Sequence, residues 1–421
     1  MKISIRKMML LGSVLALIMS FTLAPYPIDG YEYTGIRRLL RLELIMKDEL
    51  KDAKPPLGAQ KSMADIKLNL VGSRGDSLDV LPAVDPAFQK AVSGVFSGLD
   101  ASYSLAITEI TKDKPLRFMK LQEKRGYQPG SVGKLAVLTG FFHQIAKIYP
   151  KSYASRIELM KTKQVRGGRW VLTDSHTIPV YDIETKKLTK RIAKEDDVFS
   201  LFEWIDHMLS VSNNGAASVV WREVMLMDAF GEKYPELTDD EANEYFKNTP
   251  KKDLSDIATR VVNQPLRDLC IDEQEWKLGS FFTYGASNIV PDKGGSIGTV
   301  IGLMKYLVAV ERGKVIDQES SLEIKRLMYM TDRRIRYASA PALSTAAVYF
   351  KSGSLYQCRE EEGYNCQKYM GNKSNFMNSV AIIEHENGTT YLVCLMSNVL
   401  KRNSSSDHLA LATSIDRIMQ K

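Results

Sequence analysis

Apolar positions along the chain change their spacing several times, and each spacing predicts a different kind of element. Continuous apolar runs at 103–110 and 116–121 are typical of strands, and together they predict the first hairpin of an antiparallel sheet. From about Ser131 the apolar residues recur every three or four positions instead, which predicts helices. These predicted helices contain Leu135, Leu138, Phe142 and Ile145; Val198, Leu201, Phe202, Ile205 and Leu209; Ala216, Val219 and Val220; and Val300, Met304, Leu307 and Val308.

Beyond this helical middle, the spacing returns to that of strands. Runs at 346–350, 380–383 and 391–396 predict three strands, and Asn387-Gly388 between the last two is a strong hairpin-turn signal. A final helix is predicted over about 407–419. This order of elements predicts an α+β fold, in which an antiparallel sheet is flanked by helices and carries an inserted helical lobe.

The N-terminus has the pattern of an export signal. Lys2, Arg6 and Lys7 precede an uncharged apolar stretch that ends at Ala24. Residues 1–24 are therefore predicted to be a signal peptide, or an N-terminal membrane anchor, since the stretch is nearly long enough to stay in a bilayer. We expect an exported protein of the periplasm or cell envelope. The mostly polar residues 25–94 are predicted to be an extension, either a stem or a packed segment, ahead of a main domain over 95–421.

Composition narrows the functional classes. With 44% hydrophobic and 25% charged residues the chain is that of an ordinary globular protein. The net charge is +7, but the basic residues are scattered and not interleaved with aromatics, so no nucleic-acid partner is expected. Outside the cytoplasm Cys358 and Cys366 can form a disulfide, whereas Cys394 is expected in the core. Neither CxxC spacing nor a histidine pair indicates a metal, and no cofactor is expected.

The first candidate motif is Ser131-Val132-Gly133-Lys134, at a predicted helix start just after Pro129-Gly130. A serine hydroxyl is a poor nucleophile at neutral pH and needs a base within hydrogen-bond reach. A lysine one turn later lies on the same helix face, and the positive end of the helix dipole helps to keep that lysine neutral. Taken alone, a capping serine beside a solvated lysine is the commoner explanation.

Two later motifs carry matching chemistry. Ser212-Asn213-Asn214 lies between two predicted helices, where Ser212 can relay a proton toward a leaving nitrogen and Asn214 can bond the lysine or a substrate carbonyl. At the end of an apolar run, Lys351 and Ser352 can hold a substrate carboxylate, and Gly353 before Ser354 lets the substrate backbone lie close. Separately, a capped turn and an edge-strand lysine explain these residues as well.

Taken together, the three motifs resemble the S-x-x-K, S-D-N and K-T-G elements of class A β-lactamases and penicillin-binding proteins. Each lies in the required context of helix start, interhelical loop or strand end. The resemblance covers about residues 95–421 and implies a β-lactamase/DD-peptidase-like fold. It also implies acyl transfer, in which Ser131 attacks a carbonyl, Lys134 takes its proton and Ser212 passes one to the leaving nitrogen. The backbone N–H groups of Ser131 and Ser354 would form the oxyanion hole.

The chain departs from the family pattern in three respects. Asn213 stands where aspartate is usual, and Ser352 replaces the usual threonine while keeping the hydroxyl. The longer spacing between motifs implies insertions within 151–197 and 239–290, and the first, which contains Gly167-Gly168, is predicted to be an added hairpin.

The deacylation base is the third departure. The run Tyr234-Pro235-Glu236-Leu237-Thr238 resembles the Glu-Pro-Glu-Leu-Asn run that begins with this base in class A β-lactamases, but it has tyrosine in the glutamate's place. Glu236, Glu241 and Glu244 are the nearest carboxylates and the candidate bases, although surface positions are commoner for such residues. Without a base, an acyl-enzyme would form and persist, as the resemblance to penicillin-binding peptidases implies.

Three functions stay open on the sequence. The favoured one is a class A β-lactamase-related serine hydrolase that forms an acyl-enzyme on Ser131 and hydrolyses a β-lactam or related amide. The second is a D-alanyl-D-alanine carboxypeptidase or penicillin-binding protein acting on peptidoglycan peptides, and the third is a non-catalytic envelope binding module with the same fold. A Ser-His-Asp or zinc hydrolase is disfavoured because the five histidines look isolated.

Overall fold

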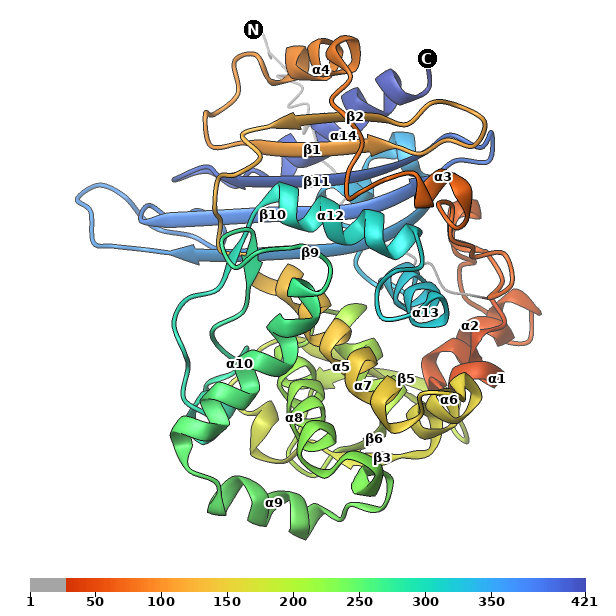
Figure 1. Ribbon diagram of the computed structural model, residues 1–421, viewed down its shortest axis with the longest axis vertical. Helices are drawn as coiled ribbons and strands as arrows, with labels where there is room; N and C mark the ends of the chain where they lie inside the picture. Colours follow the sequence, from red (N-terminus) through yellow and green to blue (C-terminus); the bar gives the residue numbers. More distant parts are fainter. Residues whose placement is uncertain (1–27) are drawn as a thin grey trace, which may run out of the picture.

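A five-stranded antiparallel sheet forms the centre of the computed structural model, which describes residues 28–421 (Figure 1). The predicted signal or anchor, residues 1–24, lies outside the described residues. The strand order is β2-β1-β11-β10-β9, so the first hairpin pairs with the last strand of the chain. The strands are β1 (Ser104–Glu109), β2 (Arg117–Leu121), β9 (Ala347–Gln357), β10 (Ser374–Glu384) and β11 (Thr390–Asn398).

Helices cover both faces of this sheet and build a separate lobe below it (Figure 1). The predicted α+β fold is confirmed. The helices are α1 (Gly30–Thr34), α2 (Arg37–Met46), α3 (Ser73–Asp76), α4 (Pro86–Ser93), α5 (Lys134–Ile148), α6 (Tyr153–Thr162), α7 (Leu201–Leu209), α8 (Asn214–Phe230), α9 (Asp239–Asn248), α10 (Lys251–Arg267), α11 (Tyr284–Ile289), α12 (Val300–Glu311), α13 (Gln318–Tyr329) and α14 (Ser405–Met419).

Alternating side chains of the strands divide the core into two clusters. Along β10, Val380 and Ile382 pack with the helices of the lobe, whereas Ala381 and Ile383 pack with α4 and α14 on the opposite face. This alternation follows from the two-residue period of a strand. Because both faces are covered, the strands read as continuous apolar runs, as the sequence indicated.

The helical lobe holds three short strand pairs besides its helices. One of them, β4 with β5, is a hairpin inside the first predicted insertion. Gly167 and Gly168 do not form the turn of this hairpin, because they directly follow β3. The pairs are β3 (Gln164–Arg166) with β6 (Val198–Ser200), β4 (Thr177–Asp182) with β5 (Lys187–Ile192), and β7 (Trp276–Lys277) with β8 (Ile297–Gly298).

One residue assigned to a helix on its spacing belongs to a strand. Val198 lies in β6 and is 41% exposed, and α7 begins only at Leu201. The reason is the side chain of Ser200, which caps the helix by accepting a hydrogen bond from the backbone N–H of Glu203. Periodicity located this helix but not its first residue.

The segment before the main domain packs against it over residues 36–70. Ile36, Leu39, Leu42, Ile66 and Leu70 are buried in the same core cluster as the helices of the lobe. Arg38 forms a buried ion pair with Asp206 of α7. Among the described residues, no helix is both long enough and apolar enough to cross a bilayer.

Candidate active site

Ser131 lies in a tight turn at the start of α5. Residues Gly130–Gly133 form a single 3-10 turn, and α5 continues from Lys134. Gly130 has φ +53°, and a Cβ there would lie 2.8 Å from the backbone nitrogen of Ser354. Glycine is therefore required twice at this position, for the left-handed backbone and for the close approach of β9. The turn brings Ser131 up to the edge strand of the sheet.

The amine of Lys134 is the centre of the site. Its Nζ lies 3.1 Å from the Oγ of Ser131, so the first predicted motif forms the expected pair. The same Nζ donates to the backbone carbonyl of Ser212 at 2.6 Å and to the Oδ1 of Asn214 at 2.7 Å. These acceptors fix the amine beside the serine hydroxyl.

Ser212 joins this pair to Lys351 of β9. The Nζ of Lys351 donates to the Oγ of Ser212 at 2.8 Å, and the Nζ of Lys134 lies 3.3 Å from that same oxygen. Ser212 has φ +60°, an uncommon conformation for a non-glycine residue that turns its hydroxyl between the two amines. The three predicted motifs therefore meet, in the order Ser131, Lys134, Ser212 and Lys351.

Burial changes the protonation of both amines. Burial lowers the pKa of Lys134 to about 7, with Asp174 opposing this shift and Arg333 adding to it. Burial, helped by the charges of Lys134, Arg333 and Arg336, holds the pKa of Lys351 well below its ordinary value. At neutral pH, Lys134 is thus poised between its charged form and a neutral form that can accept a proton.

The sheet edge formed by β9 and β10 packs closely against the turn at Gly130–Gly133 and the residues just before it. A Cβ on Gly353 would lie 2.2 Å from the carbonyl oxygen of Pro129, so this glycine permits the close approach. The amide of Asn378 on β10 donates to the carbonyls of Gln128 and Pro129, both at 3.0 Å. Arg336 donates to the carbonyl of Gly353 at 2.8 Å.

Ser352 is placed differently from its neighbours. It stands opposite Ser379 in the β9–β10 register, and the hydroxyl of Ser379 contacts His408 of α14. Opposite residues of paired strands share a face, so Ser352 points toward α14 and is absent from the residues lining the cleft in the described chain. Its role in carboxylate binding stays a prediction.

A cleft of about 430 Å³ opens over Ser131. Ser131, Asn214 and Ser354 line it, and Lys134 and Lys351 are buried behind them. The wall beside Lys134 is apolar and aromatic: the ring of Phe282 lies 5.2 Å from Nζ. The full lining is Gln128, Gly130, Ser131, Ser175, His176, Asn214, Leu278, Ser280, Phe281, Phe282, Ser296, Ser354, Leu355, Tyr356, Lys368 and Tyr369.

The candidate deacylation bases are not brought to this cleft. Glu236, Glu241 and Glu244 are exposed, and among the described residues no Asp or Glu lines the cleft. Glu241 instead caps the start of α9 with Thr238. Tyr234, which stands where the family has its glutamate, is buried and donates to Glu223. The similarity of this run to Glu-Pro-Glu-Leu-Asn therefore does not identify residues that line the cleft.

Two residues that the sequence analysis did not single out, Asp174 and His176, lie beside the second motif. The Oδ1 of Asp174 is 2.6 Å from the Nδ1 of His176, and His176 lines the cleft. The Oδ2 of Asp174 accepts from the backbone nitrogens of Asn214 and Gly215 at 2.6 and 3.0 Å. The sequence signal for them is an Asp-x-His within a predicted insertion, which corrects the expectation that the histidines are isolated.

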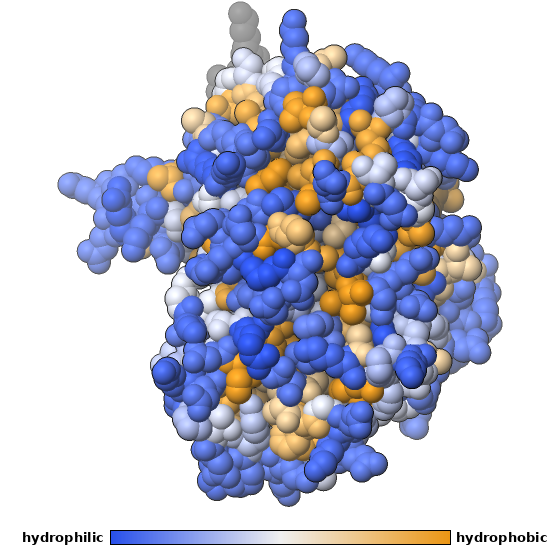
Figure 2. All heavy atoms as spheres, in the orientation of Figure 1, coloured by the Kyte–Doolittle hydropathy of each residue, from blue (hydrophilic) through white to orange (hydrophobic). Residues whose placement is uncertain are grey.

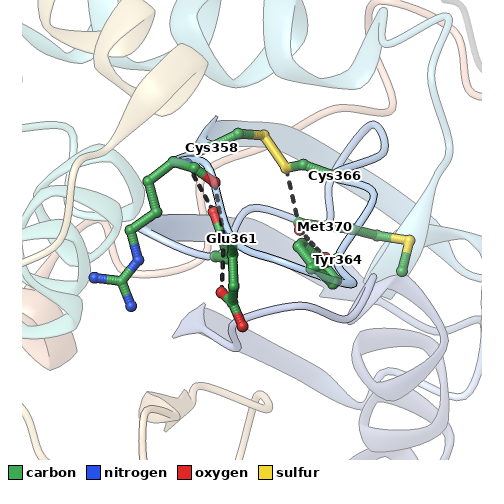
Figure 3. Close-up of a disulfide and its surroundings, with 7 residues drawn as sticks. Cys358, Glu361, Tyr364, Cys366 and Met370 are labelled. Atoms are coloured by element: carbon green, nitrogen blue, oxygen red, sulfur yellow. Dashed lines mark hydrogen bonds between the residues drawn. A yellow bond between two sulfur atoms is a disulfide. The ribbon is translucent and has the colours of Figure 1, made fainter.

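The hairpin extension between β9 and β10 supplies the outer wall. It is closed by a disulfide between Cys358 and Cys366, as predicted (Figure 3), and it projects to the left of the body in Figure 1. Figure 2 shows that mainly hydrophilic side chains cover it. Lys368 and Tyr369, just after the disulfide, line the cleft, and the guanidinium of Arg336 lies 5.4 Å from the Tyr369 ring.

Within the same described residues, no group of histidine, cysteine, aspartate and glutamate side chains is arranged to hold a metal ion. Cys394 is buried in β11, as expected from its apolar run, and Cys270 is an exposed free thiol.

This fold, with a serine–lysine pair facing a lysine on the edge strand, is that of the class A β-lactamase and penicillin-binding protein superfamily, which confirms the resemblance. The model of the beta-lactamase enzyme family matches residues 87–417, and the chain belongs to that family.

Solved structures agree with the fold. The chain is similar to the TLA-3 extended-spectrum beta-lactamase, with a TM-score of 0.53 and 13% identity over 80% of this chain and 99% of that one. It is also similar to a beta-lactamase from Chitinophaga pinensis DSM 2588, with a TM-score of 0.51 and 13% identity over 79% of this chain and 98% of that one. No curated protein matches.

Proposed function

We propose that this protein is a serine hydrolase that forms an acyl-enzyme on Ser131 with a β-lactam or a related amide. The observation that carries the proposal is the 3.1 Å approach of the Lys134 amine to the Ser131 hydroxyl, in a buried setting that favours the neutral amine. A neutral amine has a lone pair, so it can accept the hydroxyl proton as the oxygen attacks.

The proton then has a short path to the leaving group. As the Ser131 oxygen bonds to the carbonyl carbon, its proton passes to Lys134. When the amide C–N bond breaks, Ser212 gives its proton to the departing nitrogen and regains one from Lys134, whose Nζ lies 3.3 Å away. Lys351 lies on the far side of Ser212. A substrate carboxylate beside it would favour the protonated amine and pair with it.

Hydrolysis of the acyl-enzyme is expected to be slow. No carboxylate lines the cleft in the described residues, and Phe282 and Leu278 make the wall beside Lys134 apolar. A water molecule attacking the ester therefore lacks a carboxylate base there. This observation favours a D-alanyl-D-alanine carboxypeptidase or penicillin-binding protein as the second candidate, with peptidoglycan peptides as substrates.

One experiment separates the candidates. The protein is mixed with a chromogenic cephalosporin and with a reporter penicillin, and turnover is measured together with intact mass. An adduct on Ser131 that persists for many minutes supports the penicillin-binding function, and rapid turnover supports the lactamase. Ser131→Ala should abolish both signals, whereas Ser280→Ala, which removes another hydroxyl of the same cleft, should keep them. If the parent protein shows neither an adduct nor turnover, the non-catalytic binding module is the remaining candidate.

We also propose export to the periplasm or cell envelope. The charged-then-apolar N-terminus supports it, and so does the Cys358–Cys366 disulfide, because such bonds persist in oxidising compartments. Fractionation of cells that produce the full chain, with the mass of its N-terminus, tests export and separates cleavage from anchoring.

A further inference from the structure

The second motif lacks its usual carboxylate, and the structure provides a carboxylate beside it. Asn213 stands where the family has aspartate, and its side chain caps α8 by accepting from the backbone nitrogen of Ala216 at 2.6 Å. The other end of the same amide donates to the carbonyl of His176 at 2.8 Å, which an aspartate could not do. The substitution therefore ties the motif to residues 174–176.

Asp174 is built into this junction. Its side chain is 3% exposed, and each of its oxygens is engaged: one accepts from the α8 N-terminus, at Asn214 and Gly215, and the other from the backbone and ring of His176. A carboxylate at a helix N-terminus is stabilised by the backbone N–H groups and by the helix dipole. Burial acts to raise the pKa of Asp174, but the hydrogen bonds and charge of His176 and the backbone N–H of Gly215 lower it below its ordinary value, so the carboxylate is charged at neutral pH.

This carboxylate is linked to the base by one residue. Asn214, whose backbone nitrogen is held by Asp174, uses its side chain to hold the amine of Lys134 at 2.7 Å. The other charged groups that act on the lysine pair, Arg333 and Arg336, are positive. Asp174 is therefore placed both to position Asn214 and to offset the positive charge around Lys134.

We propose that Asp174 is a positioning residue of the acylation step, which fixes Asn214 against Lys134 and supplies to the surroundings of Lys134 the negative charge that Asn213 does not carry. This inference rests on the proposed function, because it assigns Asp174 a part in the reaction of Ser131. His176 is the group that Asp174 orients on the cleft wall, with its Nδ1 engaged and its other ring nitrogen, Nε2, without a partner among the described residues.

The test compares the pH dependence of Ser131 modification in the parent and in Asp174→Asn. Two probes are used: a reporter penicillin, and a fluorophosphonate, which phosphonylates an activated serine whatever its natural substrate. With the second probe, a bond forms between Ser131 Oγ and phosphorus, the P–F bond breaks, fluoride leaves, and the hydroxyl proton goes to Lys134. Loss of the carboxylate makes the protonated lysine less favourable, so the midpoint should move down by about 0.5 to 1 pH unit. The plateau should fall about tenfold as Asn214 loosens.

Two further variants make the result specific. Asp317→Asn removes a comparable carboxylate that caps α13 and pairs with Arg156 outside the cleft, so it should leave the midpoint unchanged. His176→Gln keeps the charge of Asp174 and should not lower the midpoint. An unshifted midpoint in Asp174→Asn overturns the inference. Loss of the rise in rate near neutral pH in His176→Gln overturns it too, because the titrating group would then be the imidazole.

The two probes keep the inference and the proposed function apart. Parent protein that reacts with the fluorophosphonate but not with penicillin overturns the proposed substrate class, while the phosphonylation profile still tests Asp174. Parent that reacts with neither probe overturns both statements, since Ser131 would not be activated.

Discussion

At the scale of single residues, the site depends on an amine that can lose its proton near neutral pH. Burial brings the pKa of Lys134 to about 7, and Ser131, Ser212 and Asn214 surround its Nζ. Below this pH the amine is charged and cannot accept the serine proton. Above it, the neutral amine is available, so the proposed acylation should depend on pH through a group that in water would stay charged.

We therefore predict that the rate of Ser131 acylation rises with pH through about 7 and levels off above it. Lys134→Arg keeps the positive charge but cannot lose a proton, so its rate should fall by about 10² to 10⁴-fold. Lys368→Arg, the same substitution on the cleft rim, should keep the profile. The measurement is the rate of adduct formation with a reporter penicillin from pH 5.5 to 9. A flat profile in the parent would refute the role of Lys134.

A second prediction at this scale concerns Gly353. A Cβ at this position would lie 2.2 Å from the carbonyl oxygen of Pro129, so Gly353→Ala must push β9 away from the nucleophile turn. We expect the acylation rate to fall about 100-fold, because the oxyanion donors at Ser131 and Ser354 separate. Gly94→Ala, where the added Cβ meets open space, is the matched control. Equal acylation rates in both variants would contradict the predicted close approach.

The parts of the site that could be predicted from the sequence are those whose residues are close together along the chain. Ser131 and Lys134 lie one helical turn apart, so local periodicity placed them together. His176 and Phe282 reach the same cleft from different insertions of the helical lobe, and no local pattern encodes where those insertions fold. Residues 234–238 show the reverse: their sequence resembles the family's Glu-Pro-Glu-Leu-Asn run, but in the structure Tyr234 is buried against Glu223 and does not line the cleft.

At the scale of elements, the hairpin extension between β9 and β10 forms the outer cleft wall. The disulfide between Cys358 and Cys366 closes the segment just before Lys368 and Tyr369 (Figure 3). Ser131, Lys134 and Ser212 lie in the body of the protein, whereas Lys368 and Tyr369 line the cleft, with the Tyr369 ring also beside Arg336. The extension should therefore affect how well a substrate is held more than how fast it reacts.

We predict that replacing both Cys358 and Cys366 with serine raises the penicillin concentration needed for half-maximal acylation by about three- to tenfold. The limiting acylation rate should stay unchanged, because the distances around Ser131 do not involve the extension. Adding a reductant to the parent should reproduce the effect, and Cys270→Ser, at an exposed free thiol, should not. A drop in the limiting acylation rate without a change in the half-maximal concentration would contradict the prediction that the extension affects binding and not reaction.

The positions of helices and strands were predictable where the apolar residues kept one spacing over several turns or residues. The ends of these elements were less predictable. The strands around 380–383 and 391–396 were found because they are apolar on both faces. The start of α7 was placed too early because Val198 continues the helical spacing by chance while Ser200 sets the cap. Helix α10 carries apolar residues at helical spacing, such as Leu254, Ala258 and Val261, which would have predicted it within the second insertion.

At the scale of the whole molecule, the main domain and the segment before it share one core. The apolar residues of 36–70 are buried with those of the lobe helices, and Lys61 reaches Glu384 of β10. The polar composition of this segment is compatible with a stem and with a packed segment, because an amphipathic helix exposes its polar face in both cases. The distinction depends on whether the apolar stripe finds a partner, and that partner lies far away in the sequence.

The last prediction tests this shared core. Leu39 of α2 is 1% exposed, so Leu39→Ala should lower the free energy of unfolding by about 2 to 5 kcal/mol through lost burial and a residual cavity. Leu57 lies in the same N-terminal segment but is 66% exposed, and Leu57→Ala should change it by less than about 0.5 kcal/mol. Urea unfolding followed by circular dichroism measures both. If the segment is part of the core, Leu39→Ala unfolds in one transition at lower urea. An unchanged main transition preceded by a small early one would instead make residues 28–70 an independently melting appendage.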